Sequence, residues 1–154
     1  MNLQATRCAV YPSPPVPFKC DPAAGRAVRR YVRDRAIAGG RPDLADESEL
    51  IAAELFANAI DAQLRQCVTT VINVQATVQG HSVVIEIYDH AEGGPFLRDL
   101  GDNWQTAEHG RGMWMVNSIT RGAWGWERWA TGKVVIAVIS QPLPEDPRVA
   151  PVSS

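Results

Sequence analysis

The chain has 154 residues, enough for one domain with a single hydrophobic core. Its 15 basic and 17 acidic residues give a net charge of -2, so it lacks the positive excess by which proteins bind nucleic acids or anionic membranes. Three widely spaced cysteines without a CxxC pair predict reduced thiols rather than a disulfide framework or a zinc site. No apolar run is long enough to span a bilayer, so we expect a soluble cytoplasmic protein with no direct nucleic-acid partner and no membrane contact.

Proline-rich segments flank the expected domain. Residues 1–17 include the run YPSPPVP, and residues 141–154 contain four prolines. Proline cannot continue a helix or donate to a central strand. We therefore expect a flexible lead-in over 1–17, in which residues 3–11 could supply an edge strand, then a domain over 18–140 and a disordered tail over 141–154.

A first helix is expected to begin at Asp21 and to end at Ala38. Asp21 followed by Pro22 is typical of a helix N-cap and its first position, and the apolar residues that follow recur at helical spacing. Gly39 and Gly40 then end the helix.

A second helix is expected over residues 47–64, with Asp46 as its N-cap. This helix is apolar nearly all round, so we expect it to be buried. Glu54 and Asn58 lie one turn apart on one face, and Asp61 lies a step further along it. Burying a carboxylate and an amide is costly, so the pair predicts an internal hydrogen-bonded cluster or the floor of a ligand site; the alternative is a solvated stripe on a half-buried helix.

The pattern then changes to that of β-strands. Residues 68–78 alternate between a core face and a wetter face, and Val83–Asp89 return as the partner strand of a hairpin. Asp89 ends the apolar row of that second strand, which places a carboxylate at the edge of the core. Residues 124–129 and 134–140 are expected to complete the sheet.

Residues 90–109 show no sustained period, which is typical of a lid, a binding loop or a disordered segment. They lead to Gly110-Arg111-Gly112-Met113, which opens a third helix that ends at Arg121-Gly122. Backbone N–H groups at a helix start suit a phosphate, and glycine lets a ligand approach the main chain. A glycine pair before a helix is, however, more often only a turn.

These residue types together indicate phosphate chemistry. The amide oxygen of Asn58 could complete the shell of a Mg²⁺ ion shared with phosphates. One turn earlier, Glu54 could accept a proton from a hydroxyl or water that attacks a terminal phosphate. Asp89 is an acceptor suited to the exocyclic amine of a purine, although it could instead cap a turn.

The order of these pieces resembles that of the GHKL ATPases. The string AAELFANAI is similar to their N-box, YDHAEGG to their first glycine box and HGRGMWMV to their second. The short domain, its opening VPFKCDPAAGRAVRRYV and its closing GWERWATGKVVIAVI resemble the bacterial anti-sigma factor serine/threonine kinases. The resemblance covers about residues 16–140. It implies an α/β two-layer sandwich, with a mixed, mostly antiparallel sheet of four or five strands and helices on one face.

The resemblance also implies ATP and Mg²⁺ as cofactors and a role for each site residue. Family members phosphorylate a small anti-sigma-factor antagonist protein and bind a sigma factor in its absence, and many are homodimers. Residues 90–109 would be the nucleotide lid. The implied roles are Glu54 as catalytic carboxylate, Asn58 as Mg²⁺ ligand, Asp89 as adenine reader with Gly93 beside it, and Gly110, Arg111, Gly112 and Met113 as the cradle for the phosphates.

Three positions depart from the family pattern. Ala91 stands where the first glycine box has glycine, so we expect a looser turn on the adenine side. Val134 takes the position before the last strand that is often threonine, and Asp61 adds a carboxylate near the phosphates. The leading hypothesis is an ATP-dependent protein serine/threonine kinase and anti-sigma regulator. The alternatives are a non-catalytic protein-binding module of the same fold and, less favoured, a detached sensor-kinase catalytic domain.

Overall fold

The computed structural model describes residues 14–97 and 111–140. Within this part of the chain, no helix is both long enough and apolar enough to cross a membrane. Its strands and α-helices are β1 (Val16–Phe18), α1 (Gly25–Ala38), α2 (Ala45–Arg65), β2 (Ile72–Gln79), β3 (Ser82–Asp89), α3 (Arg111–Thr120), β4 (Trp124–Trp129) and β5 (Gly132–Ser140), with short 3-10 helices at Pro22–Ala24 and Pro42–Leu44.

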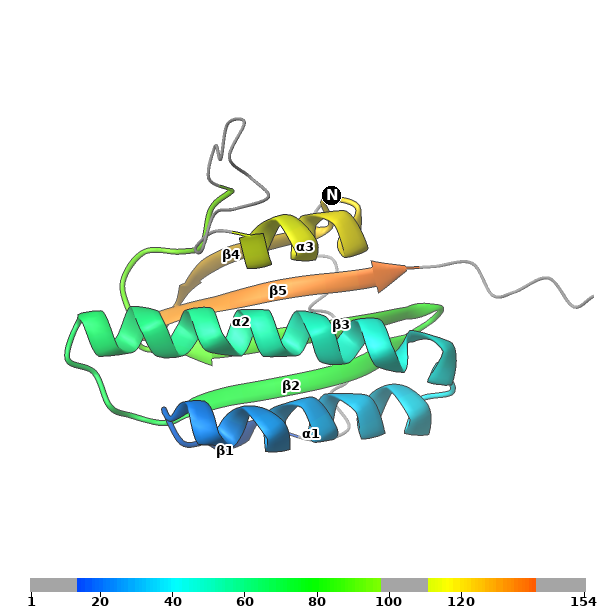
Figure 1. Cartoon of the computed structure of the whole chain (residues 1–154), viewed down its shortest axis with the longest axis horizontal. Helices are drawn as coiled ribbons and strands as arrows, with labels where there is room; N and C mark the ends of the chain where they lie inside the picture. The colour runs from blue at the N-terminus through cyan, green and yellow to red at the C-terminus, as the bar shows by residue number, and fades with distance from the viewer. Residues whose placement is uncertain (1–13, 98–110, 141–154) are drawn as a thin grey trace, which may run out of the picture.

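The five strands form one sheet in the order β1-β2-β3-β5-β4. Figure 1 shows α1, α2 and α3 side by side on the same face of this sheet. The predicted α/β two-layer sandwich is therefore confirmed. Every strand pairing among the described residues is antiparallel, so the sheet is more regular than the mixed one we expected.

The sheet begins inside the segment that the sequence assigned to the lead-in. Val16 pairs with Val74 and Phe18 with Ile72, which makes β1 an edge strand. Pro17 is tolerated there because an edge strand leaves one row of backbone groups unpaired. The edge strand predicted over residues 3–11 lies outside the described residues.

Both helix starts differ in detail from the prediction. Asp21 does act as a cap, accepting a hydrogen bond from the Ala23 amide at 2.9 Å, but it caps a 3-10 turn that precedes α1. The prediction of Asp46 as N-cap of α2 is wrong, because a 3-10 turn runs directly into α2 and the helix begins at Ala45. Asp46 lies instead in the first turn and forms an exposed ion pair with Arg33 at 2.7 Å.

The expectation that α2 is buried on all sides is also wrong. Its core side carries Ile51, Leu55 and Phe56, each at most 2% exposed. On the other side Leu50 and Leu64 remain about half exposed, at 49% and 50%. The sheet and the neighbouring helices cover only part of the α2 surface, so its polar stripe lies at a boundary between core and solvent.

The two faces of the sheet are both buried. The face toward the helices carries the main core, with Ile85 and Ile87 at its centre. The opposite face carries a second cluster of Val84, Val134, Ile136 and Val138. Gln75, which the sequence assigned to a wetter face, is only 2% exposed, so that prediction is wrong. The strand itself also begins later than predicted, at residue 72 rather than 68.

Candidate functional site

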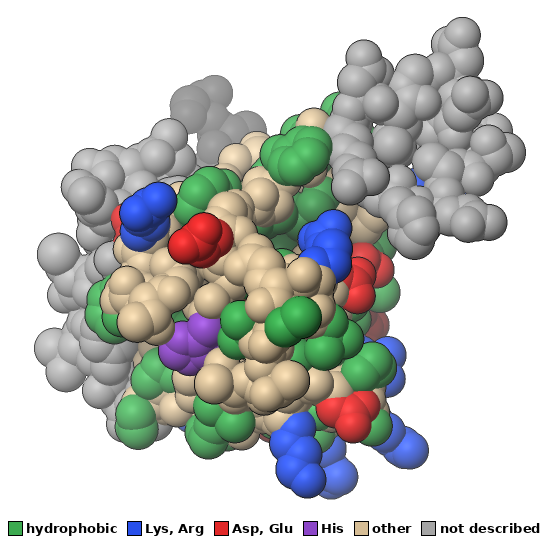
Figure 2. Space-filling model, turned by 90° about the vertical axis from the view of Figure 1, so that its left-hand side faces the viewer, with side chains coloured by type: hydrophobic (Ala, Val, Ile, Leu, Met, Phe, Trp, Pro, Cys, Tyr) green, Lys and Arg blue, Asp and Glu red, His purple; other side chains and the backbone are tan. Residues whose placement is uncertain are grey.

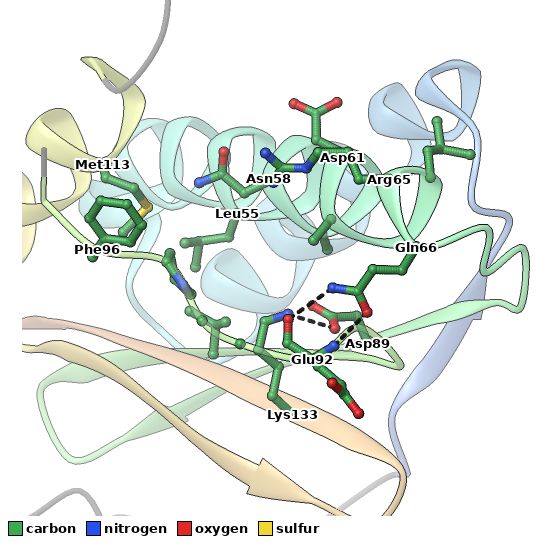
Figure 3. Close-up of a pocket in the computed structure, with 17 residues that line it drawn as sticks. Leu55, Asn58, Asp61, Arg65, Gln66, Asp89, Glu92, Phe96, Met113 and Lys133 are labelled. Carbon is green, nitrogen blue, oxygen red and sulfur yellow. Dashed lines mark hydrogen bonds and ion pairs between the residues drawn. The ribbon is translucent and has the colours of Figure 1, made fainter.

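A cavity of about 640 Å³ lies between the C-terminal half of α2, the end of β3, the start of β5 and α3. Figure 3 shows α2 along one side of it, with the ends of β3 and β5 along the other. Figure 2 views the molecule from the end at which α2 finishes, where acidic, basic and apolar side chains alternate without a continuous surface of one sign. The polar residues that line the cavity include Asn58, Asp61, Gln66, Asp89, Glu92 and Lys133.

Asn58 and Glu54 are both half-buried on α2. Neither side chain forms a hydrogen bond or ion pair with another described residue, so the two do not form an internal hydrogen-bonded cluster. Asn58 lines the cavity, and Asp61 lines it from an exposed position one turn further along. Of the readings left open by the sequence, the hydrogen-bonded cluster is thus wrong among the described residues, whereas the half-buried positions fit both a polar stripe on a half-buried helix and the wall of a ligand site.

Glu54 lies just outside the cavity lining and contacts the start of α3. A Cβ atom added to Gly112 would overlap Oε2 of Glu54, so only glycine allows this approach. Burial raises the pKa of the Glu54 carboxyl above its ordinary value. Glu54 and Gly112 are thus in contact at the edge of the cavity, although they are 58 residues apart in the sequence.

Asp89 closes the opposite end of the cavity, where β3 finishes. The residue is 2% exposed. Its Oδ1 accepts hydrogen bonds from the Ala91 amide at 2.9 Å and from Lys133 Nζ at 2.8 Å. Its Oδ2 is buried and accepts no hydrogen bond from the part of the chain that the structure describes. One oxygen therefore caps a turn, as the alternative reading proposed, while the other remains an unsatisfied acceptor.

The turn after Asp89 is held firmly despite the missing glycine. Ala91 is fully buried, its amide binds Asp89, and its carbonyl lies 3.5 Å from Lys133 Nζ. The expectation of a looser turn at Ala91 is therefore wrong, because the methyl group is accommodated in the core.

The position facing Asp89 is Lys133 and not Val134. Asp89 and Lys133 are directly paired across β3 and β5, so their side chains share one face of the sheet. Val134 is paired with Tyr88 and belongs to the cluster on the opposite face. The assignment of Val134 to the adenine side was wrong by one residue, which in a strand means the wrong face.

The model of one protein family, described as the histidine kinase-like ATPase domain, matches residues 18–139. The chain belongs to this family. No curated protein matches the chain significantly. Membership of the histidine kinase-like ATPase domain family implies that the domain binds ATP.

The residues of this ATPase domain fit such a ligand. The buried, unsatisfied Oδ2 of Asp89 can accept an N–H group from a purine. The Asn58 amide, free of hydrogen bonds to the described residues, can supply an oxygen to Mg²⁺, which binds few protein groups and keeps several waters.

The structure brings together most of the predicted site. Asn58, Asp89, Gly93 and Met113 line the cavity of the ATPase domain. Glu54 and Gly112 contact one another beside it. Arg111 is exposed at the start of α3 and does not line it. Gly110 and most of the predicted lid lie outside the described residues.

Sequence reasoning missed three residues that shape the site. Lys133 falls between the strands expected over residues 124–129 and 134–140 and was given no role, although a lysine directly before an apolar strand is a recognisable signal. Gln63 and Gln66, near the end of α2, bind the loop after β3. Gln63 accepts from the His90 amide at 2.9 Å, and Gln66 exchanges two hydrogen bonds with the Glu92 backbone, at 2.8 and 2.9 Å. Their positions on the helix gave no sign of these partners.

Proposed function

We propose that the domain is an ATP- and Mg²⁺-dependent protein serine/threonine kinase that phosphorylates a small anti-sigma-factor antagonist protein. We further propose that it acts as a partner-switching regulator that binds a sigma factor, in the cytoplasm and as a homodimer. The observation that carries the catalytic part is the cavity itself. It presents an amide without a described partner, Asn58, on one wall and a buried unsatisfied oxygen, Asp89 Oδ2, on another.

Each residue has a distinct role in this proposal. Asp89 binds the base, and Asn58 holds Mg²⁺ beside the phosphates. ATP supplies the phosphoryl group. Glu54 accepts the proton of the substrate hydroxyl. The hydroxyl oxygen forms a bond to the γ-phosphorus, while the bond from the γ-phosphorus to the bridging β-phosphate oxygen breaks and ADP leaves. The raised pKa of Glu54 makes it a stronger proton acceptor than an exposed glutamate.

A second candidate is a non-catalytic binding module of the same fold. The enclosure of Asp89 supports it, because Lys133 already occupies one carboxylate oxygen and the other has almost no contact with solvent. In that case the cavity binds nucleotide weakly, and the domain acts by sequestering its protein partner.

Thermal unfolding separates the two candidates. Mg²⁺-ATP is expected to raise the melting temperature of the wild-type chain, because a ligand that binds only the native state stabilises it. Asn58→Ala is expected to remove most of that rise. Asn73→Ala is the matched control, since Asn73 is half-buried on β2, outside the cavity lining, and its variant should keep the full rise. No rise with wild type at millimolar nucleotide leaves only the binding module.

The protein substrate is identified by capture. The wild-type chain is used to isolate binding proteins from the native cell, and each is incubated with γ-labelled ATP and the kinase. The proposal expects label on a serine or threonine of a small antagonist protein. Captured partners that take up no label, together with a clear ATP-induced stabilisation, would contradict the kinase assignment and keep the ATP site.

A further inference from the structure

Lys133 is an unusual residue for the place it occupies. It lies opposite Asp89 on the helix-facing side of the sheet, and the side chains of Lys133 and Asp89 are 4% and 0% exposed. The ammonium and carboxylate are 2.8 Å apart. Figure 3 shows the pair at one end of the cavity. Lysine is rarely buried so completely unless it is paired.

Stability alone does not account for this ion pair. Taking two charges out of water costs free energy that their attraction only partly returns, and apolar replacements of similar volume are often as stable or more so. A buried ion pair that lines a ligand cavity is therefore better explained by what it offers to the ligand.

A count of hydrogen bonds shows what the pair offers. Asp89 Oδ1 accepts from both Lys133 and Ala91, whereas Oδ2 accepts from no described residue. An ammonium has three N–H donors. Among the described residues Lys133 has two acceptors, Asp89 Oδ1 and, at 3.5 Å, the Ala91 carbonyl. One acceptor and one donor therefore remain side by side at this end of the cavity.

We infer that Lys133 is a specificity-determining residue that reads the base together with Asp89. Asp89 Oδ2 accepts an N–H bond from an exocyclic amine, while Lys133 Nζ donates to the neighbouring ring nitrogen. Adenine carries this combination on its Watson–Crick edge, as the C6 amine and N1. Guanine and hypoxanthine carry a carbonyl in place of the amine, so the carbonyl oxygen and Asp89 Oδ2 would be two acceptors facing each other.

This inference rests on the proposed ATP site and adds a requirement to it. Asp89 and Lys133 both line the cavity although their side chains are almost fully enclosed, so only their cavity-facing atoms are available to a base. Once the base is bound, Lys133 contributes to affinity only for ligands that carry a ring acceptor next to the amine.

Four ligands test the inference on the unmodified full chain. Calorimetry with Mg²⁺ present compares the affinities of ATP and three analogues. 1-Deaza-ATP lacks the ring acceptor, and the triphosphate of purine riboside lacks the amine. 7-Deaza-ATP is the control, because it is altered elsewhere on the base. Loss of one hydrogen bond to a charged group weakens binding by about tenfold or more. We expect such losses for 1-deaza-ATP and the purine triphosphate, and 7-deaza-ATP within about twofold of ATP.

Two lysine variants locate the effect. In Lys133→Met, ATP and 1-deaza-ATP should bind equally, while the penalty for the purine triphosphate should persist. Lys19→Met is the matched control, because Lys19 is the other lysine of the chain and is exposed. Equal binding of ATP and 1-deaza-ATP by the wild type overturns the inference while the ATP site stands. Failure of every nucleotide to bind overturns the ATP site as well.

Discussion

The two ends of the cavity are built in different ways. At the proposed base end, Asp89 and Lys133 are held by the pairing of β3 and β5, Ala91 binds Asp89 in the turn that follows, and all three are almost completely enclosed. At the phosphate end, Glu54 and Asn58 project from a half-exposed helix and make no hydrogen bonds to other described residues. In the proposed ATP site, the groups that would read a rigid base lie on the sheet, whereas the groups that would meet a reacting phosphate lie on helices.

The two ends also differ in how their polar groups affect the stability of the fold. The base end satisfies most of its polar groups internally and leaves one buried acceptor over. The phosphate end keeps its carboxylate partly desolvated without a compensating partner, which raises the pKa of Glu54. Substitutions should therefore affect folding at the base end and chemistry at the phosphate end.

The largest effect on folding is expected from Asp89→Asn. This change removes the charge that compensates the buried ammonium of Lys133, and breaking such a pair costs about 3–5 kcal/mol of unfolding free energy. Stabilisation by Mg²⁺-ATP should also be lost. Urea unfolding of Asp61→Asn is the control, because Asp61 is exposed on the same cavity and should change stability by less than about 0.5 kcal/mol. Similar losses in both variants would remove the contrast between the two ends.

At the phosphate end, Glu54→Gln should separate chemistry from folding. Loss of the proton acceptor is expected to slow phosphoryl transfer by about 10²–10⁴-fold while ATP affinity stays within about twofold. At neutral pH the variant should be more stable than the wild type, since it no longer holds a partly desolvated charge. Glu92→Gln, an exposed change on the cavity wall, should alter neither property. Undiminished transfer in Glu54→Gln would exclude Glu54 as the base.

The pH dependence of the same variant gives the sign of this effect. The pKa of Glu54 is higher in the folded state than in the unfolded state. Protonation of Glu54 therefore stabilises the folded protein at low pH, and this stabilisation is lost as the pH rises through the raised pKa. The stability gained by Glu54→Gln should therefore grow with increasing pH across that range. Transfer by the wild type should rise over the same range, as the carboxylate becomes charged.

The parts of the site that the sequence predicted are those that depend on local pattern. Helical spacing places Glu54 and Asn58 on one face, and strand alternation ends at Asp89, without reference to any distant residue. Lys133 could not be assigned in this way, because its partner lies 44 residues away and depends on the register between β3 and β5. The family pattern was matched one residue too far along the chain, at Val134, which lies on the other face of the sheet.

The same distinction explains the errors in the fold. The individual helices and strands follow from periodicity and the two-layer sandwich from the family resemblance, whereas the burial of Gln75 depends on what covers the second face of the sheet. Half-exposure of α2 likewise depends on how much of its surface its neighbours reach. Tertiary covering is not encoded in the pattern of one segment.

The smallest effects are expected from alanine substitutions at two glycines, one at each end of the cavity. A Cβ at Gly132 would overlap the backbone oxygen of Asp89, which cannot move without disturbing the strand pairing. A Cβ at Gly112 would overlap only the tip of the Glu54 side chain, which can rotate away. We expect Gly132→Ala to cost about 1–3 kcal/mol of unfolding free energy and to weaken ATP binding.

Gly112→Ala is the counterpart at the phosphate end, and urea unfolding measures both. Alanine is the better helix former by up to about 1 kcal/mol, which offsets the displaced side chain and leaves stability nearly unchanged. Phosphoryl transfer should still fall, by less than in Glu54→Gln, because the carboxylate is moved and not removed. If Gly112→Ala destabilises the fold as much as Gly132→Ala, the Glu54 side chain cannot rotate away from the added methyl group. The phosphate end would then be as rigid as the base end.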